Sequence, residues 1–210
     1  MPTSVSKIIS YYKSFFDADK HSKTQAKKEG VDQQVILDKW EQTRLESCTK
    51  GDTIHKVFYN YLTNQKLTAE ENKIFQPYSQ TLKHWRNSDA KFICEHSIVN
   101  DEYNIIGIPD LIVEKNGTYS IIDFKTNKSI KMSNQYQKMT GMCSQFDCCN
   151  YNHYSLQLNF YALLFERFMD EPIKNLSIIH VANNKLKTIP VTKNLSFAEK
   201  LVKDYNYNNQ

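Results

Sequence analysis

Glycine and proline are scarce in this 210-residue sequence, with five residues of each. That scarcity disfavours collagen-like and low-complexity chains, and the 40% share of hydrophobic residues disfavours disorder. The apolar runs also fall far short of the roughly 18 residues that a membrane-spanning helix needs. We therefore expect one globular domain without a membrane partner.

A secretory signal is missing as well, because residues 1–10 contain no apolar core of the required kind. We expect an intracellular protein, in the cytoplasm or associated with a nucleoid, and a viral or phage origin stays open. The five cysteines are an odd number, so we do not expect a disulfide framework. Cys143, Cys148 and Cys149 lie near His153 in the sequence but lack the paired C-x2-C spacing of a zinc site.

Hydrophobic periodicity predicts helices before and after a central group of strands. Gly51-Asp52-Thr53 is typical of a helix stop followed by a new cap, and His55 falls in the first turn after it. Asn116-Gly117 predicts a two-residue hairpin turn. The expected elements are polar helical segments within residues 1–50, helices over residues 54–62, 69–86, 154–169 and 197–205, strands over residues 91–99, 105–114, 119–126, 178–182 and 187–191, and a polar loop over residues 129–152. This order implies an α/β or α+β sandwich.

The hairpin brings charged residues together. If Lys115 pairs with Thr118 across the turn, Asp110 lies opposite Asp123, and Lys125 projects from the same face because side chains alternate along a strand. Like charges opposed across strands destabilise a sheet, so a shared proton, a salt bridge or a cation must compensate. A hard divalent ion fits best, because Mg²⁺ binds through one or two carboxylates plus substrate phosphates.

A plain Asp–Lys–Asp salt-bridge cluster, or acids at an exposed strand edge, would produce the same pattern without catalysis. Residues 105–113 and 121–126 are apolar on both faces, however, which predicts a buried setting for these charges. Buried ionisable groups with close partners are commonly functional. The net charge of +4 is compatible with a phosphate-backbone partner without requiring one. Phosphodiester chemistry is therefore the favoured interpretation.

Pro109-Asp110 followed by Asp123-Phe124-Lys125 resembles the signature of the PD-(D/E)xK nuclease superfamily. Other motifs are similar to those of its RecB-like branch, which includes the mitochondrial single-strand exonuclease and CRISPR-associated RecB-like exonucleases. They are Gly51-x-x-x-His55, Gly107-x-x-Asp110, Ile122-Asp123-Phe124-Lys125-Thr126 and Gln157-x-x-x-Tyr161. The similarity covers about residues 40–166. It implies an α/β fold with a central mixed β-sheet flanked by helices, as in the restriction-endonuclease-like core.

The resemblance also implies a metal centre that uses Mg²⁺ or Mn²⁺. Asp110, Asp123 and the main-chain carbonyl of Phe124 would bind the ion, and His55 would complete its shell. Glu95 is a further candidate ligand, because an acid often precedes the hairpin in RecB-like sequences. No iron–sulfur cluster is expected, since the branch that carries one has three cysteines after the Q-x-x-x-Y helix, and this chain has none there.

The same resemblance assigns roles to three further side chains. Lys125 would orient the attacking water and offset charge in the transition state. Gln157 and Tyr161 would lie on one helical face, against the active site or the nucleic acid. The catalytic set would thus be His55, Asp110, Asp123 and Lys125.

The implied activity is that of a metal-dependent deoxyribonuclease, an exonuclease that acts on DNA ends or single strands in repair, recombination or replication. Residues 1–210 would form one nuclease domain, with a helical N-terminal part (1–50), a catalytic core (51–191) and a C-terminal helix and tail (192–210). The chain lacks the G-x-x-x-x-G-K-[ST] loop, so a separate helicase or replication protein would supply unwinding. Two alternatives are an RNA endonuclease of the cap-snatching type and a non-catalytic nucleic-acid-binding module with this fold.

Overall fold

The computed structural model describes residues 1–209, so Gln210, the end of the predicted tail, lies outside the described residues. In chain order the elements are β1 (Thr3–Ser4), α1 (Val5–Tyr11), α2 (Ala18–Glu29), α3 (Gln33–Leu62), α4 (Ala69–Phe75), the 3-10 helix η1 (Gln76–Tyr78), α5 (Ser79–Arg86), β2 (Lys91–Cys94), β3 (Ile98–Asn100), β4 (Ile105–Gly107), β5 (Leu111–Lys115), β6 (Thr118–Lys125), the 3-10 helix η2 (Gly141–Cys143), α6 (Asn150–Met169), β7 (Ile173–Ala182), β8 (Lys185–Val191) and α7 (Leu195–Asn208). Across the described part of the chain, no helix is both long and apolar enough to cross a lipid bilayer.

A five-stranded mixed sheet in the order β2-β5-β6-β7-β8 forms the centre of the molecule. The central pair β6–β7 is parallel and the other three pairs are antiparallel. A parallel pair needs a crossover connection, and α6 supplies it here. The predicted mixed sheet flanked by helices is therefore confirmed. A second sheet of three short strands, β1-β4-β3, lies beside it and was not expected.

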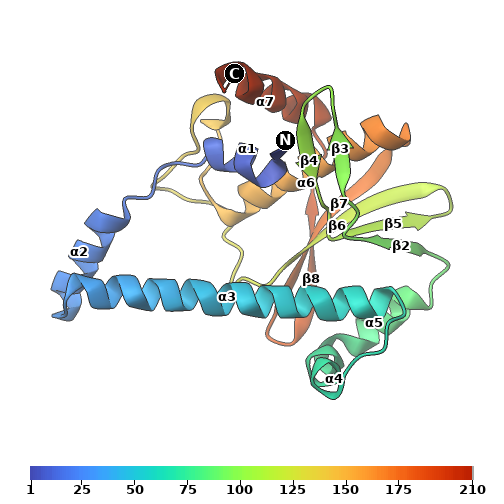
Figure 1. Cartoon of the computed structure of the whole chain (residues 1–210), viewed down its shortest axis with the longest axis horizontal. Coiled ribbons are helices and arrows are strands. Elements are labelled where there is room, and N and C mark those ends of the chain that lie inside the picture. Colours follow the sequence, from blue (N-terminus) through green and yellow to red (C-terminus); the bar gives the residue numbers. More distant parts are fainter. Residues whose placement is uncertain (210) are drawn as a thin grey trace.

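Two apolar cores lie on opposite faces of the main sheet. One core joins α1, α6 and α7 to side chains such as Ile112, Ile121 and Ile178. The other joins the C-terminal half of α3 with α4 and α5 to Leu111 and Phe124. Figure 1 shows this layering, with α3 running along the lower side of the molecule and α1 and α7 at the opposite side. Asp123 follows the alternation of Ile121 and faces the α6 layer.

The predicted helix break at Gly51-Asp52-Thr53 is wrong, because α3 continues through all three residues. The helix begins instead after Asp32, whose carboxylate accepts a hydrogen bond from Gln34 N at 2.7 Å. A glycine inside a helix costs about 1 kcal/mol, which the packing of the apolar stripe on the sheet offsets. α3 therefore crosses the proposed boundary between residues 50 and 51.

Two expected strands are each split between the two sheets. Residues 91–99 form β2 and β3, and residues 105–114 form β4 and part of β5. Pro109 lies at the second break, where it can donate no backbone hydrogen bond to a ladder. The expectation that all of residues 105–113 would be buried also fails at Ile108, which is 49% exposed. The chain thus leaves one sheet and enters the other immediately before Asp110.

The hairpin register is confirmed. Lys115 pairs with Thr118 and Leu111 pairs with Ile122, as the two-residue turn requires. Asn116 and Gly117 both have positive φ angles, 52° and 70°, which a type I′ turn demands. The ladder ends at Leu111, so the expected cross-strand pair of Asp110 with Asp123 is not part of it. Asp110 lies one residue beyond the ladder and is free to turn its carboxylate out of the strand direction.

The remaining predicted elements are present with shifted bounds. Residues 69–86 are helical but divide into α4, η1 and α5, because Pro77 interrupts the hydrogen-bond ladder. The helix expected over residues 154–169 is α6, which is buried along most of its length as its apolar sequence predicts. The expected C-terminal strands and helix are β7, β8 and α7.

Candidate active site

The predicted site residues meet at the end of β6 where the two helical layers approach the sheet. His55 comes from α3 on one side, and the motif residues of α6 come from the other. Asp110 precedes β5, and Asp123 and Lys125 close β6. The tertiary structure therefore brings together side chains from four separate segments.

Asp110 links three of these segments. Its Oδ2 accepts a hydrogen bond from Phe124 N at 2.7 Å, so the carboxylate continues the pairing of β5 with β6 beyond the end of the ladder. Its Oδ1 lies 3.4 Å from His55 Nδ1. The strand break at Pro109 makes this possible, because a regular strand would direct the side chain away from the backbone of its neighbour.

Asp123 is 1% exposed and lies beside Lys125, whose Nζ is 2.5 Å from Asp123 Oδ2. Burial, together with the charge of Asp110, raises the pKa of Asp123 to about 6. Burial lowers the pKa of Lys125, but the charges of Asp123 and Asp110 outweigh burial and raise it overall. The raised pKa keeps Lys125 a cation at neutral pH, and Asp123 keeps its proton to a higher pH than an ordinary aspartate does.

His55 contacts an acceptor with each ring nitrogen. Nε2 lies 3.0 Å from the Phe124 carbonyl oxygen, and Nδ1 faces Asp110. Burial opposes the charged imidazolium, yet the hydrogen bond to Asp110 and the charges of Asp110 and Asp123 raise the pKa of His55 above its usual value. His55 thus connects Asp110 with the Phe124 backbone, and its role as a metal ligand stays a prediction.

The oxygen donors here fit a hard divalent cation. Asp123 Oδ2 is buried without a well-aligned hydrogen bond, although it forms the ion pair with Lys125. Within residues 1–209, no three His, Cys, Asp or Glu side chains gather closely enough to hold an ion unaided. An ion would rely on the two carboxylates, the Phe124 carbonyl and oxygens of solvent or substrate. That set suits Mg²⁺ or Mn²⁺ better than a closed zinc site.

Glu95 lies at the rim of this cluster. It directly follows β2 rather than lying within a strand, and its φ angle of 49° is uncommon for a residue other than glycine. With His55 and Asp110 it lines a cavity of about 10 Å³. Backbone conformations of this kind cluster at functional sites, and Glu95 as a metal ligand stays a prediction.

Gln157 and Tyr161 are joined on one face of α6. Gln157 Nε2 donates a hydrogen bond to Tyr161 OH at 2.8 Å, and Tyr161 is only 5% exposed. Burial, with the charges of Asp123 and Asp110, raises the pKa of Tyr161. The pair thus lies beside the acids, and Gln157 is the more accessible end of it.

Tight packing against α6 explains the glycine at position 107, just before the Pro-Asp motif. A Cβ at this position would lie 2.8 Å from Tyr161 Cδ1 and 2.9 Å from Leu164 Cδ1. We expect Gly107→Ala to lower the free energy of unfolding by about 1–3 kcal/mol through overpacking. Urea unfolding measures the change. Gly51→Ala is the matched control, because its Cβ would meet only Thr126 Oγ1, at 3.3 Å, and alanine favours the helix. Equal losses in the two variants would contradict this account.

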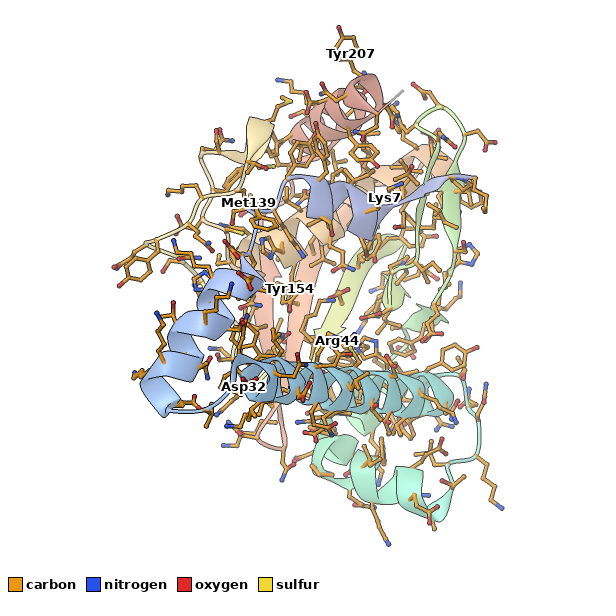
Figure 2. All side chains as sticks on the ribbon, turned by 60° about the vertical axis from the view of Figure 1, so that its left-hand side comes forward. Lys7, Asp32, Arg44, Met139, Tyr154 and Tyr207 are labelled. Atoms are coloured by element: carbon orange, nitrogen blue, oxygen red, sulfur yellow. The ribbon has the colours of Figure 1, made fainter. Side chains whose placement is uncertain are left out.

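Tyr154 is a residue of the site that the sequence analysis missed. Lys125 Nζ lies 4.8 Å from the centre of its ring, and Tyr154 OH donates to Asn127 Oδ1 at 2.6 Å. His180 Nε2 lies 2.7 Å from the Asn127 carbonyl oxygen, at hydrogen-bond distance. Figure 2 shows Tyr154 above α3, near the middle of the molecule. Its position three residues before Gln157, on the same helical face, is the signal that could have identified it.

Removal of the Tyr154 ring is expected to weaken any activity that needs Lys125 in place. A cation–π contact contributes about 0.5–2 kcal/mol, so Tyr154→Leu should lower kcat by about 2- to 30-fold. Tyr154→Phe keeps the ring and should restore most of that loss. Steady-state kinetics of the two variants makes the comparison. A Phe variant as slow as the Leu variant would assign the effect to the Asn127 hydrogen bond instead.

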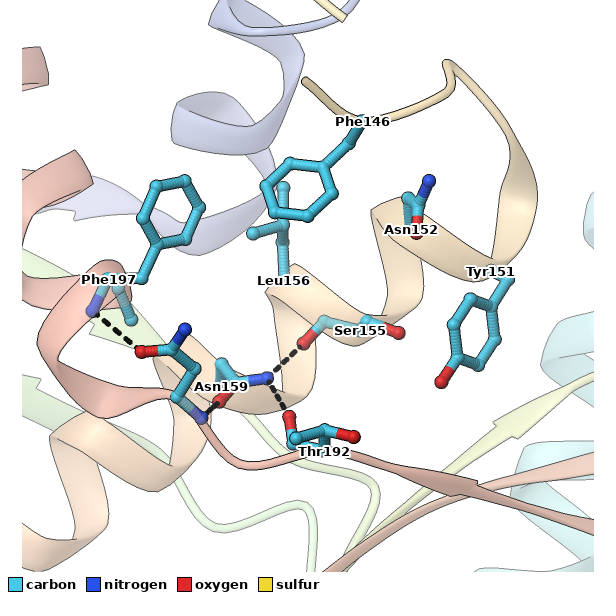
Figure 3. Close-up of a pocket in the computed structure, with 10 residues that line it drawn as sticks. Phe146, Tyr151, Asn152, Ser155, Leu156, Asn159, Thr192 and Phe197 are labelled. Atoms are coloured by element: carbon cyan, nitrogen blue, oxygen red, sulfur yellow. Dashed lines mark hydrogen bonds between the residues drawn. The ribbon is translucent and has the colours of Figure 1, made fainter. Parts of the chain in front are cut away.

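Another cavity, of about 280 Å³, lies away from these residues between α6, the end of β8 and α7. Figure 3 shows its lining, with Phe146 and Phe197 on one side and Asn159 at the base. Asn159 Nδ2 donates to the carbonyls of Ser155 and Thr192, and its Oδ1 accepts from Asn194 N. Asn159 therefore joins α6 to the start of α7, which holds the far side of α6 in place.

A mixed sheet between two helical layers, with a buried Asp–Lys pair at the end of one strand and a second Asp just before its neighbour, is the arrangement of an α/β nuclease. Comparison of families identifies the class directly: the model of the PD-(D/E)XK nuclease superfamily matches residues 10–205. The chain belongs to the PD-(D/E)XK nuclease superfamily. Members of this superfamily are typically dependent on divalent metals.

The similarity of this chain to solved structures is weaker than its match to the family model. SSO0001 has a TM-score of 0.37 and 13% identity, over 67% of this chain and 60% of that protein. A candidate exonuclease from Eubacterium rectale has a TM-score of 0.44 and 13% identity, over 77% of this chain and 65% of that protein. The chain thus spans less than two thirds of the length of either. A search of curated protein sequences found no match.

Proposed function

We propose that this protein is a Mg²⁺- or Mn²⁺-dependent deoxyribonuclease of the RecB-like branch, which removes nucleotides from DNA ends or single strands. The observation that carries the proposal is the cluster of His55, Asp110, Asp123 and Lys125 around the Phe124 backbone, in a chain of a nuclease superfamily. The order of the four motifs along the chain supports the RecB-like assignment. A role in repair, recombination or replication, with a separate helicase or replication protein, is part of the same proposal, as is a single nuclease domain.

The residues of the cluster have separate roles in hydrolysis. Asp110, Asp123 and the Phe124 carbonyl would hold the divalent ion, which polarises the phosphate and lowers the pKa of water. Lys125 orients the attacking water and offsets negative charge at the phosphorus. The water releases a proton to solvent as its oxygen bonds to phosphorus, the bond to the leaving oxygen breaks, and that oxygen takes up a proton from solvent. Tyr154 keeps the Lys125 ammonium in place, and Gln157 lies next to the substrate.

A cleavage panel tests this function. Labelled DNA and RNA, each linear and circular, are incubated with Mg²⁺, with Mn²⁺ or with chelator. We expect loss of nucleotides from linear DNA with either metal, no reaction in chelator, and survival of circles. Cleavage of circles would show an endonuclease, and a preference for RNA would favour the cap-snatching type. Binding without cleavage under every condition would favour a non-catalytic module.

A further inference from the structure

A groove of about 600 Å³ leads away from the candidate active site. It lies between the middle of α3, the chain that follows β6 and the end of β7. His55, Phe124 and Lys125 form its inner end, so the groove is continuous with the acids. The full lining is Ser47, Cys48, Lys50, His55, Phe124, Lys125, Thr126, Asn127, Lys128, Ala182 and Asn183.

Every charged side chain that lines the groove is basic. Lys125 forms the ion pair with Asp123, but Lys50 and Lys128 have no acidic partner among the described residues. Lysines without an acidic partner also occur elsewhere among the described residues, such as Lys115 and Lys174, so Lys50 and Lys128 are distinguished by their place in the groove. The remaining polar lining consists of hydroxyl and amide side chains. A groove with free ammonium groups and neutral donors suits a phosphate backbone.

The two free lysines come from different segments and flank the same path. Lys50 lies five residues before His55 on α3, which is about 7.5 Å along the helix axis. Successive phosphates of a strand in duplex DNA lie about 3.4 Å apart along its axis, so 7.5 Å corresponds to about two nucleotides and places Lys50 to contact a phosphate near the reacting bond. Lys128 follows β6 three residues after Lys125. The volume is in the range of about 300–1,000 Å³ that proteins use for small ligands, which suits part of one strand rather than a duplex.

We propose that this groove binds the backbone of a single DNA strand beside the bond to be cleaved, with Lys50 and Lys128 as its phosphate contacts. The inference rests on the proposed nuclease function and adds the path of the substrate. Because the contacts are to phosphate, they carry affinity without sequence preference. They also make binding dependent on salt.

The test compares two double variants of the full chain with equal loss of charge. Lys50→Ala/Lys128→Ala removes the groove lysines. Lys115→Ala/Lys174→Ala is the control, because those lysines are exposed, unpaired among the described residues, and lie at the opposite end of the β6–β7 pair. Fluorescence anisotropy with labelled single-stranded DNA in chelator measures affinity at several salt concentrations. Cleavage of the same strand in Mn²⁺ supplies KM and kcat.

We expect the groove variant to lower the slope of log affinity against log salt by about 1.4, since each phosphate contact on a single strand contributes about 0.7. Its KM should rise about tenfold, more than kcat falls, and the control should match the parent. Equal behaviour of the two variants, with a parent that cleaves DNA, would overturn the groove and leave the nuclease standing. A parent that binds DNA but never cleaves, with the same loss of slope, would keep the groove and overturn the nuclease.

Duplex DNA and single-stranded RNA form the other arms of the experiment. The proposal is supported if the groove variant loses more affinity for the single DNA strand than for the duplex. The opposite order would overturn the assignment to one strand. If only RNA binding responds to the substitutions, the occupant is RNA and the proposal for DNA fails.

Discussion

Lys125→Met is expected to lower the rate of DNA cleavage by about 10²- to 10⁴-fold, the range for loss of one group that stabilises charge or transfers a proton in a transition state. Methionine keeps the length and apolar stem of the side chain but removes the ammonium beside Asp123. Lys125 is 17% exposed, so no other cation in solution easily replaces it. Single-turnover cleavage of labelled DNA measures the effect.

A matched control separates the catalytic role of Lys125 from the effect of losing one positive charge. Lys115→Met, at the hairpin end of β5, removes one positive charge far from the candidate site and should leave the rate unchanged. Circular dichroism should show that Lys125→Met still folds, and its affinity for DNA should stay within a few-fold of the parent. A Lys125→Met variant that cleaves at the parent rate would remove Lys125 from the mechanism.

In chelator, the free energy of unfolding should fall by about 2 kcal/mol between pH 4 and pH 6 through the ionisation of Asp123. The pKa of Asp123 is about 6 in the folded protein against an ordinary 3.8, because of burial and then the charge of Asp110. Between those values the unfolded chain has released the proton and the folded chain has kept it, so stability is lost as pH rises. The pKa of His55 is also raised, which extends the decline above pH 6.5.

Asp123→Asn isolates this contribution, because the amide cannot ionise. The difference in unfolding free energy between parent and variant should change across that interval, as urea titrations at each pH would reveal. Mn²⁺ should raise the melting temperature of the parent at neutral pH, since an ion that binds only the native state stabilises it. Mn²⁺ should have little effect on Asp123→Asn. A constant difference at all pH values would show that burial does not perturb Asp123.

Local sequence patterns predicted some secondary-structure elements correctly and failed where tertiary contacts decide the structure. The hairpin at Asn116 and Gly117 was predicted with its register, because turn chemistry acts within a few residues. The stop signal at Gly51 failed, because the stripe on α3 packs against the sheet and overrides the local preference of glycine. The strand breaks near residues 95–97 and 108–110 were missed, since an apolar run does not reveal that a chain passes from one sheet to another.

The order of residues alone determined that two acids and a lysine gather at the end of a hairpin, since strand alternation and a two-residue turn dictate which side chains are neighbours. Only the folded chain decided how they are used. His55 reaches the Phe124 carbonyl from 69 positions away, and Tyr154 approaches Lys125 from the opposite layer. The basic groove likewise depends on α3 passing the ends of β6 and β7. Such contacts arise from the packing of helices on both faces of a sheet, so only the tertiary structure decides their geometry.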